Sequence, residues 1–152
     1  MRRGLAIIAL AVASCRAALP ASPAPSSPRV VAQRLPNGSL EVAVDGRYAA
    51  RPVFFPARLQ VERGTVRMLG IRVNASGMEG ELLVRTLEVP SDALAARAGE
   101  SRSVEVRWDG KDESGATAPA GTYVLLFDFA ADPGDGERRL SLGVTFELSP
   151  GD

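Results

Sequence analysis

The chain has 152 residues, of which 45% are hydrophobic and 24% charged, a composition typical of a globular domain with a substantial core. Its 18 basic and 18 acidic residues cancel, so the overall charge argues against nucleic acid as a partner. Histidine is absent and cysteine occurs once, at Cys15, which removes the commonest general base and metal ligand and excludes an intramolecular disulfide.

The start of the chain has the pattern of an export signal. A positively charged beginning precedes an apolar run over residues 5–13, which is shorter than the roughly 20 residues that span a bilayer. We therefore predict a signal peptide over residues 1–14. The tetrapeptide VASC, residues 12–15, resembles the bacterial lipobox, in which cleavage precedes a cysteine that becomes acylated. The resemblance implies a lipidated Cys15 and a stable membrane anchor, with an ordinary secretory signal as the alternative.

A proline-rich segment follows the cysteine. The sequence RAALPASPAPSSPR has four prolines among alanines and serines, which favours an extended, semi-rigid tether rather than a core. We assign the lipidated cysteine and this tether to residues 15–29. The residue after the cysteine is Arg16, and not the Asp that resembles an inner-membrane retention signal in enteric bacteria. We therefore expect a domain in the cell envelope, held near a membrane, with the outer membrane favoured over the inner.

Residues 30–65 are expected to form a strand region ahead of the main domain. Apolar and polar residues alternate there, the period of a half-buried strand, with apolar side chains at Leu40, Val42 and Val44. Phe54 and Phe55 are adjacent, so on a strand they point to opposite faces. We expect one ring in the core and the other exposed, where it is a candidate partner surface.

Residues 66–150 show the same period in several apolar runs: Leu69, Ile71 and Val73; the less regular Leu82 to Val89; Val104, Val106 and Trp108; Tyr123, Leu125, Phe127 and Phe129; and Leu140, Leu142, Val144, Phe146 and Leu148. Only residues 91–97 predict a helix, of at most two turns. The glycine- and proline-containing residues 130–136 predict a long hairpin loop between the last two strands. About seven short strands separated by turns predict an all-β fold, an antiparallel β-sandwich.

The most distinctive motif lies in two parts. A VRTL strand, residues 84–87, precedes WDGKDESGATAPAGTY, residues 108–123, whose key positions are Trp108, Asp109, Gly110, Asp112, Gly115, Gly121 and Tyr123. This order resembles the Ig-like domain of the bacterial flagellar hook-capping protein and its relatives at the ends of secreted proteins. The resemblance implies an Ig-like sandwich over residues 66–150, with a structural role for the seven motif residues. It implies a fold and not a part in flagellar assembly.

The charged centre of the motif, residues 109–115, is also a candidate calcium site because three carboxylates lie close together. The ligands of an EF-hand loop, however, do not fall at their required positions. Asp-Gly is a tight-turn pair, and Asp112 can accept hydrogen bonds from its own turn. We therefore predict a turn with Trp108 and Tyr123 in the core, and we expect no metal and no other cofactor.

A second acidic loop contains Asp132, Asp135 and Glu137, and we expect it to be solvated, with calcium as the alternative. No nucleotide-binding fingerprint is found, and neither histidine nor an available thiol offers catalysis, so we expect a protein that is not an enzyme. The predicted function is protein–protein interaction or structural support, through loops or a sheet edge. The alternative is a module that binds carbohydrate or calcium at the membrane surface.

Overall fold

The computed structural model of the protein describes residues 29–45, 47–77, 80–91 and 95–150. In these ranges the chain forms ten strands: β1 (Arg29–Leu35), β2 (Gly38–Val44), β3 (Arg47–Tyr48), β4 (Val53–Val61), β5 (Thr65–Gly77), β6 (Gly80–Leu87), β7 (Ala96–Arg97), β8 (Ser101–Trp108), β9 (Gly121–Asp132) and β10 (Arg138–Leu148). No helix in the described part of the chain is long and apolar enough to cross a membrane.

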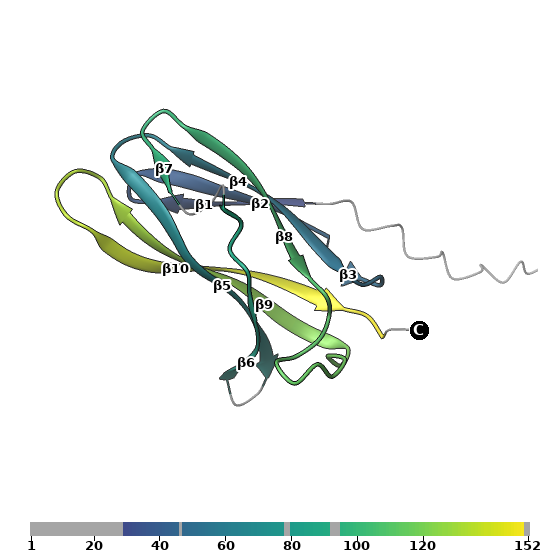
Figure 1. Ribbon diagram of the computed structural model, residues 1–152. Coiled ribbons are helices and arrows are strands. Elements are labelled where there is room, and N and C mark those ends of the chain that lie inside the picture. Colours follow the sequence, from purple (N-terminus) through teal and green to yellow (C-terminus); the bar gives the residue numbers. More distant parts are fainter. Residues whose placement is uncertain (1–28, 46, 78–79, 92–94, 151–152) are drawn as a thin grey trace, which may run out of the picture.

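The strands form two sheets that face each other (Figure 1). The four-stranded sheet has the order β1-β2-β4-β8, and the six-stranded sheet has the order β3-β10-β9-β5-β6 with β7 paired to the start of β5. Paired strands are antiparallel, except that β3 runs parallel to the end of β10. The predicted all-β sandwich is therefore confirmed. Two of its ten strands, β3 and β7, are only two residues long.

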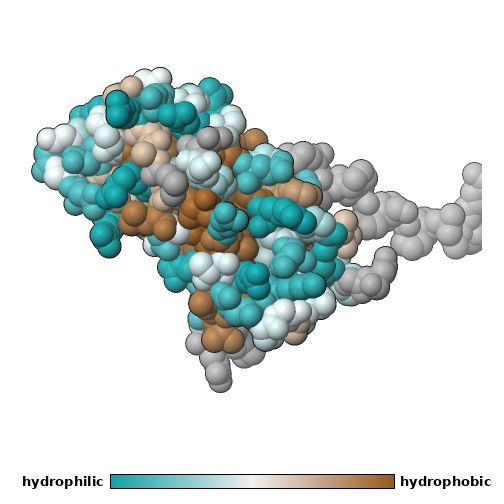
Figure 2. All heavy atoms as spheres, viewed as in Figure 1, coloured by the Kyte–Doolittle hydropathy of each residue, from teal (hydrophilic) through white to brown (hydrophobic). Residues whose placement is uncertain are grey.

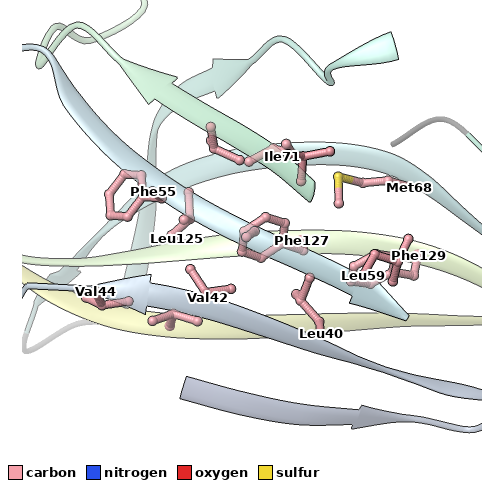
Figure 3. Close-up of a cluster of buried hydrophobic side chains, with 14 of the residues drawn as sticks. Leu40, Val42, Val44, Phe55, Leu59, Met68, Ile71, Leu125, Phe127 and Phe129 are labelled. Atoms are coloured by element: carbon pink, nitrogen blue, oxygen red, sulfur yellow. The ribbon is translucent and has the colours of Figure 1, made fainter. Parts of the chain in front are cut away.

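The core lies between the sheets and takes side chains from both (Figure 3). Every second residue is buried in β4, and in β8 from Val104 onward, as the period of two requires. Each fully buried Leu, Ile or Phe contributes about 1.5–3 kcal/mol. The largest buried side chains are aromatic: Trp108, Phe55, Phe127, Phe129 and Phe146.

The early and late parts of the chain fold around this one core. The strands β1, β2 and β4, which precede β5 in the chain, make three of the four strands of the four-stranded sheet. The later strand β8 completes that sheet by pairing with β4. In Figure 3, Leu40 and Phe55 from the early part lie in the same cluster as Phe127 and Phe129 from the late part.

The last two strands form the predicted hairpin. β9 pairs with β10 along their length, from Gly121 opposite Leu148 to Ala131 opposite Arg138. The connecting loop comprises residues 133–137, which is shorter than expected because both strands extend to the turn.

The prediction of a helix over residues 91–97 is wrong at its C-terminal end. Ala96–Arg97 forms β7, which pairs with the start of β5, and the Ala98 amide donates a hydrogen bond to the Gly64 carbonyl at 2.9 Å. These long-range hydrogen bonds outweigh the local helix signal, because intrinsic propensity amounts to at most about 0.7 kcal/mol per ordinary residue. Residues 92–94 of the predicted helix lie outside the described ranges.

β5 contains a bulge between Met68 and Gly70. The bulge leaves Leu69 exposed by 42%, while Met68 is buried with Ile71. The prediction that Leu69 shares the inner face with Ile71 and Val73 is therefore wrong. A bulge adds one residue to a strand and shifts the inward–outward alternation by one position.

Candidate functional site

The WDG loop, residues 109–120, connects β8 to β9, and Asp112 lies at its centre. The Oδ1 atom of Asp112 accepts hydrogen bonds from the Ser114 amide at 2.9 Å, the Ser114 hydroxyl at 2.6 Å and the Ala116 amide at 3.0 Å. These bonds lower the pKa of Asp112 below its ordinary value, and the bond from the Ser114 hydroxyl has the largest effect. This carboxylate therefore holds the turn of its own loop.

Asp109 and Gly110 begin the loop. Asp109 Oδ1 accepts a hydrogen bond from the Lys111 amide at 2.9 Å. Gly110 has a φ of 79°, and a Cβ atom there would lie 2.6 Å from Cδ of Arg51, whose side chain lies across the glycine. Gly115, with a φ of 85°, supplies a second left-handed position. Conformation and close packing thus both require glycine at Gly110.

Two buried aromatic residues hold the ends of the loop. Trp108, at the end of β8, is fully buried, and its Nε1 donates to the Lys111 carbonyl at 2.9 Å. Tyr123 is buried near the start of β9, which begins at Gly121, and its hydroxyl donates to the Pro119 carbonyl. The two ring centroids are 5.4 Å apart. Burial raises the pKa of Tyr123, which keeps its hydroxyl a proton donor at neutral pH.

The WDG loop also packs against β6, the last strand of the six-stranded sheet. The Glu113 amide donates to the Val84 carbonyl at 2.9 Å, and Glu113 Oε1 accepts from the Thr86 amide at 2.7 Å. Arg85 Nη1 donates to the Asp112 carbonyl at 2.9 Å. Three consecutive residues of the VRTL strand therefore contact the loop, a link between the two parts of the motif that their spacing in the sequence does not reveal.

The loop covers only part of the outer edge of β6. Its contacts span residues 84–86, whereas residues 80–83, here called the β6 edge, pair only with β5 among the described strands. The β6 edge carries Leu82 and Leu83, whose side chains are 73% and 50% exposed. Figure 2 shows hydrophobic spheres at the lower end of the molecule, where Figure 1 places β6. The sequence offered one signal for these residues, the broken alternation at two adjacent leucines.

The carboxylates of the second acidic loop are also engaged. Asp132 Oδ1 accepts hydrogen bonds from two amides of its own loop, at 2.8 and 3.3 Å. Asp135 pairs with Arg138 at 3.1 Å, and Glu137 pairs with Arg67 at 2.7 Å. Within the described ranges, no group of three or more His, Cys, Asp or Glu residues is placed to hold a metal ion.

Phe54 and Phe55 lie on opposite faces of the four-stranded sheet, as predicted. Phe55 is fully buried, with its ring centroid 5.3 Å from that of Tyr48 and 4.9 Å from that of Phe146. Phe54 lies on the outer face and is 43% exposed. The outer face of this sheet therefore carries an exposed aromatic ring that is separate from the β6 edge.

Cys15, the predicted lipidation site, lies outside the residues that the structure describes. No family model matches the chain, and no curated protein matches it either. What the protein does is therefore to be inferred from its own residues and geometry.

Proposed function

We propose that the chain is an exported, non-enzymatic lipoprotein of the bacterial cell envelope, anchored at Cys15, whose sandwich binds a protein partner through the β6 edge. The observation that carries the proposal is the exposed pair Leu82 and Leu83 on a strand edge that no described strand covers. The resemblance to the hook-capping Ig-like domain implies the fold alone, so the proposed interaction or structural role rests on the exposed edge. No observation favours calcium or carbohydrate, since Asp112 and Asp132 are engaged by their own loops.

A free strand edge is a liability that proteins usually cover or charge, because its unpaired amides and carbonyls attract other strands. The terminal strand of the other sheet, β8, follows this rule with exposed Glu105 and Arg107. The WDG loop covers β6 at residues 84–86. The β6 edge departs from the rule, since it carries two exposed leucines and one charged residue, Glu81, which accepts a hydrogen bond from Asn74. A surface kept apolar beside an otherwise protected edge is typical of a binding site.

The two leucines suit the addition of a partner strand. Across β5, Leu82 lies opposite Ala75 and Leu83 lies opposite Asn74. Successive side chains leave a strand on opposite faces, so the leucines flank the edge from both sides of the sheet. In strand addition the main-chain hydrogen bonds give affinity and the alternating side chains give specificity. A partner strand along residues 80–83 would meet one leucine on each face.

A photoreactive amino acid at Leu82 tests the partner surface in the bacterium that makes the protein. We expect a discrete adduct with one partner, and none when the same probe replaces Leu69, which is exposed on a different strand. Leu83→Glu added to the Leu82 probe should abolish the adduct, because pairing would desolvate the new charge. Leu69→Glu is the matched control and should leave the adduct unchanged. Equal adducts at both probes, or an adduct that survives Leu83→Glu, would contradict the proposed surface.

Membrane attachment has its own test. Cells grown with a labelled fatty acid should label the wild-type protein, because acylation at Cys15 adds the chains that anchor it. Cys15→Ala should lose the label and release the protein from the membrane fraction. Label that persists in Cys15→Ala would show that attachment does not use this residue.

A further inference from the structure

A shallow groove of about 440 Å³ crosses the outer face of the four-stranded sheet. Four of its wall residues come from the four strands: Val30, Ala43, Pro56 and Glu105. The register aligns them, because Val30 lies opposite Ala43 and Pro56 lies opposite Glu105. Phe54 stands two residues before Pro56 and so shares its face. The groove thus has a row of apolar residues across three strands that ends at Glu105 on the fourth, and its other wall residues include Glu41, Arg58 and Ser103.

This surface is unusual for the molecule. The described ranges contain five large apolar side chains that are exposed; one of them, Val30 at 64%, lines this groove, and a second, Phe54 at 43%, lies beside it on the same face of β4. The other three, Leu69, Leu82 and Leu83, belong to β5 and β6 in the opposite sheet. The groove is therefore separate from the β6 edge, and a segment that bound there would not be the partner of that edge.

We propose that the groove is the docking site of the chain's own proline-rich segment, residues 16–28. This segment joins β1 at Arg29, and the next residue, Val30, is already part of the groove wall. The segment consequently starts at the mouth of the groove. It is also apolar enough to fill it, with Leu19 and four prolines among small residues.

The length and conformation of the segment fit the path. From β1 to β8 the path crosses three interstrand spacings, roughly 14 Å in all. A proline-rich chain in the polyproline II conformation advances about 3.1 Å per residue, so about five residues complete the crossing. The segment has 13 residues, from 16 to 28. A segment in this conformation binds with a small entropic cost, because little conformational freedom remains to be lost.

A weak groove is sufficient because the segment is covalently attached. Short linkers give an effective concentration in the millimolar range, so a groove with a Kd of about 1 mM for the free peptide would be filled about half the time or more. A docked segment holds the sandwich in one orientation relative to its N-terminus. It covers the four-stranded sheet and leaves the β6 edge, on the other sheet, free.

A nitroxide label at residue 24, introduced as Ala24→Cys in a Cys15→Ala chain, provides the test, because residue 24 is the fifth before Arg29 and so the one expected to reach β8. In protein that lacks the predicted signal peptide, residues 15–152, the label broadens the NMR signals of amides that it approaches. We expect the amides of Ser103 and Glu105 on β8 to lose at least about twofold more intensity than those of Ser141 and Thr145 on β10, as half-occupied docking requires.

The comparison with β10 is a stringent one. Gln33 of β1 donates a hydrogen bond to the Gly143 carbonyl of β10 at 2.7 Å, so β10 lies directly beside β1. By contrast, β8 is three strands away from β1 in the four-stranded sheet. A tether that sampled the surface freely would therefore reach β10 at least as often as β8. Greater broadening on β8 is the signature of docking.

Matched variants complete the test. Phe54→Asp should remove the excess broadening on β8, whereas Leu69→Asp, whose exposure of 42% is close to the 43% of Phe54, should leave it unchanged. Thermal unfolding checks that each variant is folded, and Ala43→Asp serves as the second groove variant. Equal broadening of β8 and β10, or excess broadening that survives the groove variants in folded protein, would overturn the inference. Neither result bears on the crosslink at Leu82.

Discussion

Asp112 accepts three hydrogen bonds within its own loop, and its pKa is lower in the folded chain than the ordinary value of 3.8. A carboxylate of this kind stabilises the fold above its ordinary pKa, and the contribution is lost as the pH falls through the folded pKa. Asp112→Asn keeps an acceptor oxygen and loses the charge. We expect it to melt below the wild type at pH 7, with a difference that shrinks as the pH falls below 3.8.

Circular dichroism melts between pH 7 and pH 3 measure this difference. Glu41→Gln, on β2, removes a carboxylate from a strand that pairs with β1 and β4 and not with the loop, and controls for net charge. A melting difference for Asp112→Asn that stays constant from pH 7 to pH 3 would show that the lost charge is not its cause. The Asp-Gly pair and the glycines of this loop predict a stabilised turn. The structure of this loop could therefore be predicted from its local sequence.

Asn37 was not predictable in the same way. It is fully buried, and its Nδ2 atom donates to the carbonyls of Arg63, Thr65 and Asp132 at 2.7, 3.0 and 3.2 Å. These partners lie 26, 28 and 95 residues away in the chain, so no local spacing points to them. The sequence around Asn37 indicates only a turn. Only the folded structure shows that Asn37 connects three separate segments of the chain by hydrogen bonds.

At the scale of the element, the bulge in β5 decides which of two adjacent apolar residues belongs to the core. Met68 is buried and Leu69 is exposed. Met68→Ala should lower the free energy of unfolding by about 2–5 kcal/mol, as a truncation in a packed core does. Leu69→Ala should change it by less than about 0.5 kcal/mol. Urea unfolding of the two variants measures both values, and a larger loss for Leu69→Ala would place the bulge elsewhere.

The strands differ in how far their sequences define them. β8 and β10 are long and alternate regularly, so the period of two suffices to find them and their inner faces. β7 exists only because Ala96 and Arg97 pair with the start of β5. No property of those two residues predicts this pairing. The β6 edge had one signal in the sequence, its two adjacent leucines, but their exposure depends on where the WDG loop stops, at Val84.

At the scale of the whole molecule, the first residue of β1, Arg29, and the end of β5 next to the β6 edge lie at the same end of the strands. β1 begins opposite Val44, and β3, which follows that strand, pairs with the end of β10. β9 begins at Gly121 opposite Leu148, and Ala75 of β5 lies opposite Tyr123 close by. The end of β5 is therefore level with the start of β1 along the strands, although β1 and β6 lie at opposite edges of the sandwich. With Cys15 lipidated, a partner at the β6 edge would be met near the membrane.

We expect the strands before β5 to be part of the unit that folds cooperatively. Without the strands before β5, the four-stranded sheet would retain β8 alone, and the inner faces of β5, β9 and β10 would lose their cover. Sheets need a second layer to bury their apolar face. We therefore expect residues 29–152 to unfold in one cooperative transition, and residues 66–152 to lack a stable fold. Amide dispersion in NMR spectra and thermal unfolding separate the two outcomes, and a folded 66–152 would show that the early strands form an accessory to an independent domain.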